Sequence, residues 1–171
     1  MNSQINLALL ILRVAAGAMI AAHGVAHVWK DGKSNIAGTA AWFGSMGMKP
    51  PLVQAWTASI TELGAGALLV VGLLAPLAAA GLLGVMTVAF VIAHRKNGFF
   101  IYNPGQGWEY VAIIAAVAIA IGGLGAGRWS IDNALNYPLH GWPGFFVTVV
   151  GGLGGASLTL VTCWRPAKRL T

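Results

Sequence analysis

The chain alternates long apolar runs with short polar segments, and the runs have the length of transmembrane helices. A spanning helix needs roughly 20 apolar residues. Five runs reach or approach that length, at about 5–29, 52–74, 77–94, 108–126 and 145–164. These runs are apolar throughout, whereas the strands of a membrane barrel alternate apolar and polar residues. Because a helix satisfies its own backbone in lipid, the pattern predicts an all-α integral membrane bundle of five helices.

Two further patterns concern the surface and the packing of this bundle. Apolar residues between the first two runs are spaced as on one face of a short amphipathic helix at the membrane interface: Ile36, Ala40, Trp42, Phe43 and Met46. In the fifth run, Gly151 and Gly155 have the small-xxx-small spacing that lets two helices approach closely. We therefore expect these two glycines to form a packing face.

Composition agrees with a membrane location. Hydrophobic residues make up 57% of the chain and charged residues 8%, so the surface of a soluble domain, which carries about 25% charge, cannot be built. The net charge is +6, but most cations lie in short segments between apolar runs, which indicates membrane topology and not nucleic-acid binding. Cys163 is the only cysteine, which excludes an intramolecular disulfide and a Cys-x-x-Cys redox pair.

The cations predict an orientation. With five spans, eight of them fall on one side: Lys30, Lys33, Lys49, Arg95, Lys96, Arg165, Lys168 and Arg169. The other side holds only Arg128, apart from Arg13 within the first run. Positive residues remain on the cytoplasmic side of a membrane. The N-terminus is therefore expected outside and the C-terminus inside.

Glu62 is the residue with the weakest structural explanation. It lies near the middle of an otherwise uncharged run, at the depth of the bilayer midplane. A carboxyl there costs a few kcal/mol on insertion scales and is tolerated where it meets a partner or a water-filled cavity. A structural ion pair is the main alternative to a functional role.

Five other ionisable residues lie inside or at the edges of the spans: Arg13, His23, His27, His94 and Glu109. Side chains tilt toward the N-terminus of their own helix, so His23, Glu62 and His94 are expected to converge in the inner half of the bundle. Arg13 tilts outward, away from Glu62, and has snorkelling to the outer headgroups as its alternative.

The remaining candidates have plain structural alternatives. His27 fits an interfacial residue, and Glu109 fits the first turn of a helix, where the helix dipole favours an anion. His23 and His27 share a helix face, but without a second histidine pair or a Cys/His set no metal site is predicted.

The segment from Asn97 to Gly105, with Trp108 and Tyr110, supplies aromatic rings and amides on the same side of the membrane. We expect it to cover a pocket above His23, Glu62 and His94. Apolar walls with a few convergent polar groups suit a small lipophilic ligand. A quinone has this character, since its carbonyls need hydrogen-bond donors and its tail needs apolar space.

Several short motifs, taken in order, resemble the DoxX family of bacterial membrane proteins. They are Leu12-Arg-Val14, His23-Gly24, Thr39-Ala-Ala-Trp-Phe43, Met46-Gly-Met48, Glu62-Leu-Gly-Ala-Gly66, His94, Asn97-Gly-Phe-Phe100, Glu109-Tyr110 and Gly127-Arg-Trp-Ser-Ile-Asp132. The resemblance implies a four-helix membrane bundle over residues 1–132. Residues 133–171 depart from it and are expected to add a fifth, C-terminal transmembrane helix. It also implies a multi-pass protein of the bacterial cytoplasmic (inner) membrane.

The resemblance implies a redox role. Some members are subunits of a thiosulfate:quinone oxidoreductase, and others resemble anchors of redox complexes with soluble partners. The leading hypothesis is a subunit of such a complex that binds a quinone or a sulfur-containing reductant, with no covalently bound cofactor. The alternatives are a non-catalytic assembly or anchor subunit and a small proton-coupled transporter. Expected partners are the lipid bilayer and other protein subunits, with no nucleic acid.

In the leading hypothesis, Glu62 and His94 are the catalytic candidates and exchange protons. His23 would donate a hydrogen bond to a ligand carbonyl, and Arg13 would hold negative charge. The other ligand-binding candidates are Asn97, Glu109 and Tyr110.

Overall fold

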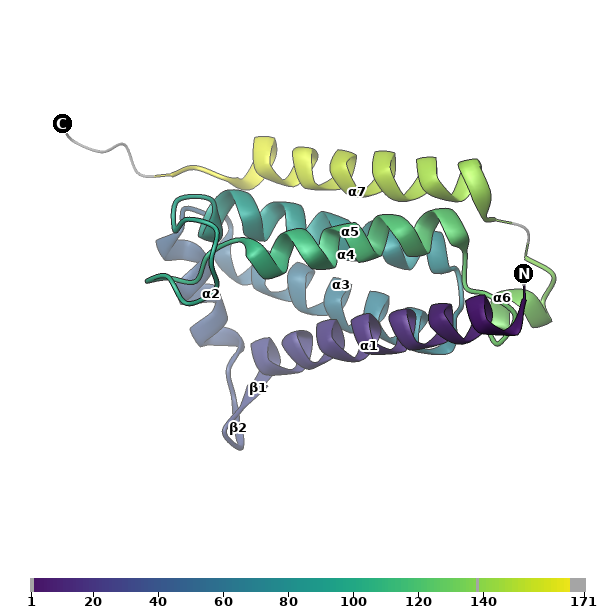
Figure 1. Ribbon diagram of the computed structural model, residues 1–171. Helices are drawn as coiled ribbons and strands as arrows, with labels where there is room; N and C mark the ends of the chain where they lie inside the picture. The colour runs from purple at the N-terminus through teal and green to yellow at the C-terminus, as the bar shows by residue number, and fades with distance from the viewer. Residues whose placement is uncertain (1, 138, 167–171) are drawn as a thin grey trace.

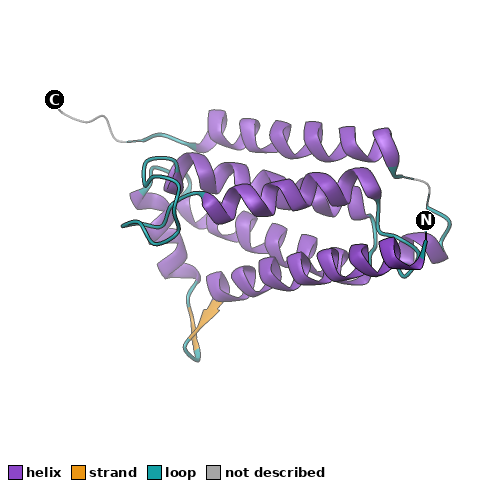
Figure 2. Ribbon diagram, in the orientation of Figure 1, coloured by secondary structure: helices purple, strands orange, loops and turns teal. Residues whose placement is uncertain are grey.

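Five long helices run roughly antiparallel and form one bundle (Figures 1 and 2). The computed structural model describes residues 2–137 and 139–166. The long helices are α1 (Ser3–Val28), α3 (Pro51–Val71), α4 (Ala75–Ala89), which continues into the π-helical turn η1 (Phe90–His94), α5 (Glu109–Leu124) and α7 (Gly141–Cys163). The smaller elements are the hairpin strands β1 (Trp29–Lys30) and β2 (Lys33–Ser34) and the short helices α2 (Ile36–Ser45) and α6 (Ile131–Ala134).

Local sequence explains where the central helices begin and end. Pro50 and Pro51 open α3, where a missing backbone N–H costs nothing. Gly72 ends it in the left-handed conformation, with φ of 69°. At the start of α4, the backbone N–H groups of Leu74 and Ala75 donate to the two carboxylate oxygens of Asp132, at 2.7 and 2.9 Å. An acid from the α6 turn therefore caps α4, and the turn between α3 and α4 is held from outside both helices.

The helices pack around α4. It contacts α3, α5 and α7, while α1 packs mainly against α3 and α5 also contacts α7. A core of small and aliphatic residues from α1, α3, α4 and α5 fills the interior, with Leu69, Ala79 and Leu82 fully buried. The sequence prediction of an all-α membrane bundle is confirmed. The expected amphipathic helix between the first two runs is α2, which packs on α3.

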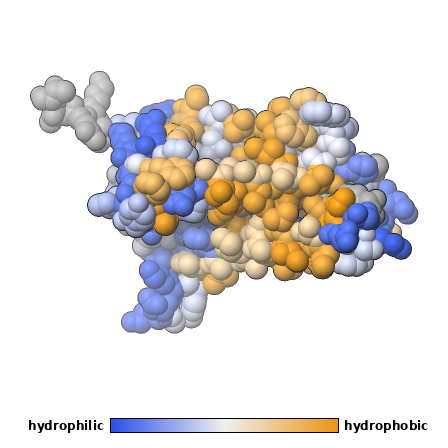
Figure 3. Space-filling model, in the orientation of Figure 1, coloured by the Kyte–Doolittle hydropathy of each residue, from blue (hydrophilic) through white to orange (hydrophobic). Residues whose placement is uncertain are grey.

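Three helical segments of the described chain are long and apolar enough to cross a membrane: Ser3–Val28, Ala75–His94 and Gly141–Cys163. The helix α5 is apolar but shorter, with 16 residues. A hydrophobic band covers the middle of the molecule between two hydrophilic ends (Figure 3). That all five long helices cross the membrane remains a prediction.

The polar ends differ in character. The helix α2, the 95–108 loop and the C-terminal end of α7 lie at one end of the bundle, opposite the N-terminus and α6 (Figure 1). The expected inner-side cations that the structure describes fall on segments at the α2 end; Lys168 and Arg169 lie outside the described residues. The cations thus gather at one end, as the topology prediction requires.

The packing face of α7 differs from the one expected. Its buried residues are Gly144, Thr148, Gly152 and Ala156, spaced four apart. The Thr148 hydroxyl donates to the carbonyl of Pro76 at 2.9 Å. Gly151 and Gly155, the expected packing pair, are exposed instead. Both spacings satisfy the small-xxx-small pattern in this glycine-rich run, so the pattern alone cannot select the correct face.

The C-terminal end of α7 is attached to the segment between α2 and α3. The Lys49 N–H donates to the Cys163 carbonyl and the Arg165 N–H to the Gly47 carbonyl, both at 2.8 Å. The Trp164 indole N–H donates to the Met46 carbonyl at 2.9 Å. The residues 46–49 are therefore held in place by the last turn of α7.

We predict that Gly152→Ala destabilises the bundle. A Cβ at this position would lie 2.9 Å from both the Ala80 carbonyl oxygen and the Leu83 Cβ, so α4 and α7 would have to separate. Overpacking of this kind costs about 1–3 kcal/mol. The midpoint of thermal unfolding in detergent should fall for Gly152→Ala and stay unchanged for Gly154→Ala, where a Cβ meets no atom within 4 Å. Equal midpoints for the two variants would contradict this packing.

Candidate functional site

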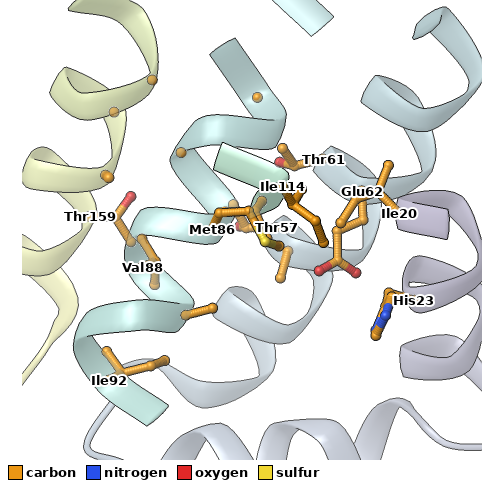
Figure 4. Close-up of a pocket in the computed structure, with 18 of the residues that line it drawn as sticks. Ile20, His23, Thr57, Thr61, Glu62, Met86, Val88, Ile92, Ile114 and Thr159 are labelled. Carbon is orange, nitrogen blue, oxygen red and sulfur yellow. The ribbon is translucent and has the colours of Figure 1, made fainter. Parts of the chain in front are cut away.

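A cavity of about 480 Å³ lies within the bundle, toward the α2 end. Its walls come from α1, α2, α3, α4, η1, α5 and α7, and they are mostly apolar. Glu62, His23 and His94, which the sequence predicted to converge, all line it. The volume lies within the range of small-molecule pockets, roughly 300–1,000 Å³. Figure 4 shows the Glu62 carboxylate and the His23 ring at one side of this space.

Glu62 has a partner that the sequence analysis did not assign to it. Its Oε2 lies 3.2 Å from Nδ1 of His27, and the glutamate is only 4% exposed. Neither of these two atoms makes a hydrogen bond to another group. The His27 ring also packs against Trp42 and Phe43, with ring centroids 6.5 and 5.9 Å away. His27 is thus part of the polar side of the cavity and not the interfacial residue expected from its position.

Close packing of α1 on α3 brings these side chains together. A Cβ on Gly17 would lie 2.7 Å from the carbonyl oxygen of Gly66, and a Cβ on Gly66 would lie 2.6 Å from that of Gly17. A Cβ on Gly24 would lie 3.1 Å from the Cβ of Glu62. The two backbones therefore approach more closely than larger residues would permit. The spacing of His23 and His27 along one helix face then turns both imidazoles toward α3.

A second polar pair lines the same cavity. His94 Nδ1 is 2.9 Å from the carbonyl oxygen of Gln106, and Nε2 is 2.7 Å from the hydroxyl of Tyr110. A carbonyl only accepts, so Nδ1 donates, and the Nε2 of a neutral imidazole accepts from the Tyr110 hydroxyl. His94 ends the π-helical turn η1, and such turns recur at functional sites because they redirect side chains within a helix. The ring is buried and held at both nitrogens.

The 95–108 loop adds a second chamber. It has a volume of about 390 Å³ and shares His23, Trp42, His94 and Tyr110 with the first. Asn97 and Gln106 line it as well. The Asn97 amide also donates to the Gly105 carbonyl at 2.6 Å, which holds the loop closed on itself. The expected cover over the pocket is therefore formed by amide-bearing residues of the loop.

The aromatic residues of this loop do not line either chamber. Phe99, Phe100 and Tyr102 are 44, 48 and 77% exposed, and they pack on one another or on Trp108. Glu109 also lies outside both chambers: its Oε2 accepts from the backbone N–H of Ile101 at 3.1 Å. The helix-end alternative considered for Glu109 therefore describes its position better than a ligand contact.

Arg13 lies at the C-terminal end of α3 and does not line the cavity. Its guanidinium donates to the carbonyls of Leu69, at 3.1 Å, and Val70 in the last turn of α3, and to the carbonyl of Trp129. It is 2% exposed, so it does not reach the outer headgroups by snorkelling. A cation at a helix C-terminus pairs with unsatisfied carbonyls and with the helix dipole. The structure does not bring Arg13 to the ligand cavity.

Sequence reasoning also missed other residues of the cavity wall. They include Gln54, Thr57 and Thr61 of α3, Trp42 and Phe43 of α2, and Met48. The regular spacing of Gln54, Thr57 and Thr61 on the face of α3 that also carries Ala58 was an available signal. Met48 stood in a motif that resembles the DoxX family, but its place in the cavity wall depends on the attachment of α7 to residues 46–49, which the sequence did not indicate.

The model of the DoxX family matches residues 8–95 of the chain, just over half of it. The chain belongs to the DoxX family. The matched range contains Arg13, His23, His27, Glu62 and His94. The DoxX match ends before Tyr110 and before α7, so the second polar pair is only half inside it. No curated protein and no solved structure matches the sequence. The chain is thus a multi-pass membrane protein of this family, with contact to lipid.

We predict that Arg13→Met lowers stability without affecting the cavity. The substitution would leave buried carbonyls of α3 and of Trp129 without their donor, at a cost of about 1–3 kcal/mol for each unsatisfied group. The thermal midpoint in detergent should fall clearly below that of the parent protein. The amount of ligand that copurifies in the cavity, per molecule of folded protein, should be unchanged, because Arg13 does not line the cavity. A stable variant that loses ligand would place the arginine in the binding site after all.

Proposed function

We propose that this protein is the quinone-binding membrane subunit of a redox complex. The observation that carries the proposal is the apolar cavity of about 480 Å³ into which a buried acid and three histidines project. A quinone needs apolar space for its ring and tail and polar groups for its two carbonyl oxygens. Proton-exchanging side chains inside a membrane are costly, which favours a functional reason for keeping them.

Reduction of a quinone to a quinol adds two electrons and two protons, and each carbonyl oxygen takes one proton. The Glu62–His27 contact and the His94–Tyr110 hydrogen bond offer two separate groups that can pass protons to a bound ligand. We infer that one group serves each carbonyl, with His23 as a further hydrogen-bond donor. The electrons would come from a partner subunit or directly from a sulfur-containing reductant.

The charge of the cavity favours a neutral ligand. Among the described residues that line it, none is lysine or arginine. An anionic sulfur compound would need such a cation, or several backbone N–H groups, to offset its loss of hydration. A quinone carries no net charge and has no such requirement. We therefore favour the quinone over the sulfur-containing reductant as the molecule bound between these helices.

We predict that Glu62→Leu removes bound quinone. Extraction of the purified protein with organic solvent should recover quinone from the parent protein and little from the variant. The affinity for an added benzoquinone should fall roughly 10- to 100-fold, as expected when a buried quinone carbonyl loses the protonated carboxyl that donates to it. Glu109→Gln is the matched control, since Glu109 lies outside the cavity. A parent protein that binds no quinone at all would refute the proposal.

The proposal also places the protein in the bacterial cytoplasmic membrane with the cation-rich α2 end inside. In a Cys163→Ser background, Asn133→Cys should react with a membrane-impermeant thiol reagent in intact spheroplasts. Ser34→Cys, at the opposite end of the bundle, should react only after the membrane is opened. Both positions are exposed, so a failure to react reports the membrane and not burial. The reverse pattern would show that the chain inserts with its N-terminus inside.

A further inference from the structure

The cavity continues beyond its polar side, along α4 to the gap between α3 and α7. Gly151, Gly155 and Thr159 of α7 line the same cavity as Glu62. Gly151 and Gly155 are nevertheless exposed. A residue that lines a cavity and is also open to the outside marks a mouth. We therefore read the space between α3 and α7, two helices that do not pack on each other, as the opening of the cavity.

The floor of this passage is one face of α4. Residues at helical spacing line it from near the start of α4 to the end of η1: Leu77, Gly81, Gly84, Val88 and Ile92. At about 1.5 Å per residue, this face extends for roughly 22 Å. Thr57, Ala58 and Thr61 of α3 form the opposite wall. The passage is thus a long, narrow groove along α4, bounded by α3 and α7.

Small residues keep the passage open. A Cβ on Gly155 would meet no atom within 4 Å, and one on Gly151 would meet only the Cβ of Ala80, at 3.4 Å. The nearest atoms to a Cβ on Gly81 are also 3.4 Å away. These glycines are not forced by helix contact, unlike Gly152, which packs directly on α4. Their lack of side chains leaves space in the passage instead.

The passage leads from lipid to the buried acid. In Figure 4, Thr159 of α7 lies on one side with Val88 and Ile92, Glu62 and His23 lie on the other, and Met86 lies between them. The side chain of Glu62 is only 4% exposed, and its Oε2 makes no hydrogen bond within the described part of the protein. A polar end with imidazoles and a carboxyl that donates when protonated, and an apolar end open to the bilayer, together match a ligand with a polar head and a long apolar tail.

We propose that the groove between α3, α4 and α7 holds the prenyl tail of the quinone, which enters sideways from the bilayer between α3 and α7. This inference rests on the proposed function, because it takes the polar end as the headgroup site. It assigns a role to α7, which lies beyond the part of the chain that matches the DoxX family. The acyl chain of a phospholipid is the competing occupant, and the test separates the two.

The test compares two quinones with the same benzoquinone headgroup, one with a methyl group in place of the tail and one with a decyl chain. Their affinities are measured on the full-length protein in lipid nanodiscs. Gly155→Phe fills the passage, whereas Gly154→Phe, one residue along, lines no cavity and has equally open surroundings. We expect Gly155→Phe to weaken binding of the decyl quinone at least 10-fold and that of the methyl quinone less than twofold. Gly154→Phe should change neither.

Each other result has a definite meaning. Unchanged decyl-quinone binding in folded Gly155→Phe overturns the tail passage, while loss of both quinones in Glu62→Leu would still support the headgroup site. An equal loss of both quinones in Gly155→Phe also overturns it, since the tail would not be the part affected. Recovery of phospholipid in place of quinone from the parent protein, with depletion in Gly155→Phe, assigns the groove to an acyl chain. If Gly155→Phe fails to fold, Thr159→Phe provides the same obstruction from the adjacent turn.

Discussion

The close contact between α1 and α3 is the constraint on which the site depends. Gly17, Gly24 and Gly66 let the two backbones approach until larger side chains would collide. Only at that separation does the carboxylate of Glu62 come within 3.2 Å of the imidazole of His27. In lipid, helices associate mainly through such packing and not through the hydrophobic effect. The glycines therefore supply both the stability of this helix pair and the position of its buried acid.

The arrangement of the helices also decides which buried cation pairs with which buried anion. The buried guanidinium of Arg13 donates hydrogen bonds to carbonyls at the end of α3. The carboxylate of Asp132 accepts hydrogen bonds from backbone N–H groups at the start of α4. Glu62 is left with histidine as its nearest charged partner. An arginine would stay protonated at any physiological pH, but an imidazole can gain and lose a proton near neutrality. Because Arg13 and Asp132 have other partners, Glu62 is paired with an imidazole, a group that is able to exchange protons.

Much of the architecture could be predicted from the sequence because it depends on local properties. Run length and continuous hydropathy gave the five long helices, and the cost of a charge in lipid identified Glu62. The partner of Glu62 could not be predicted, because His23 and His27 share a face and only the rotation of α1 on α3 decides between them. Arg13 was misjudged for a related reason: its tilt along the helix was considered, but the open carbonyls of a neighbouring helix end were not.

The glycine-rich part of α7 shows a different limit. Two sets of small residues, one position apart, satisfy the same spacing rule, and only the tertiary fit to α4 decides which set is buried. Gly152 packs against the carbonyl oxygen of Ala80, while Gly155 meets nothing. A rotation of the helix by one residue, about 100°, would bring Gly151 and Gly155 to the buried face in place of Gly152 and Ala156. The spacing of small residues correctly indicated that α7 packs closely on another helix. Which of its faces is buried depends on the side chains of α4.

The attachment of α7 to residues 46–49 has a mechanical consequence. Met48 is 1% exposed and forms part of the cavity wall, and its neighbours are held by three hydrogen bonds from the end of α7. A protein shortened before Gly141 would therefore lose the support of the α2–α3 connection as well as a helix. Conversely, a subunit that pulled on the end of α7 would act directly on the wall of the chamber. The C-terminal helix thus couples the rim of the bundle to its interior.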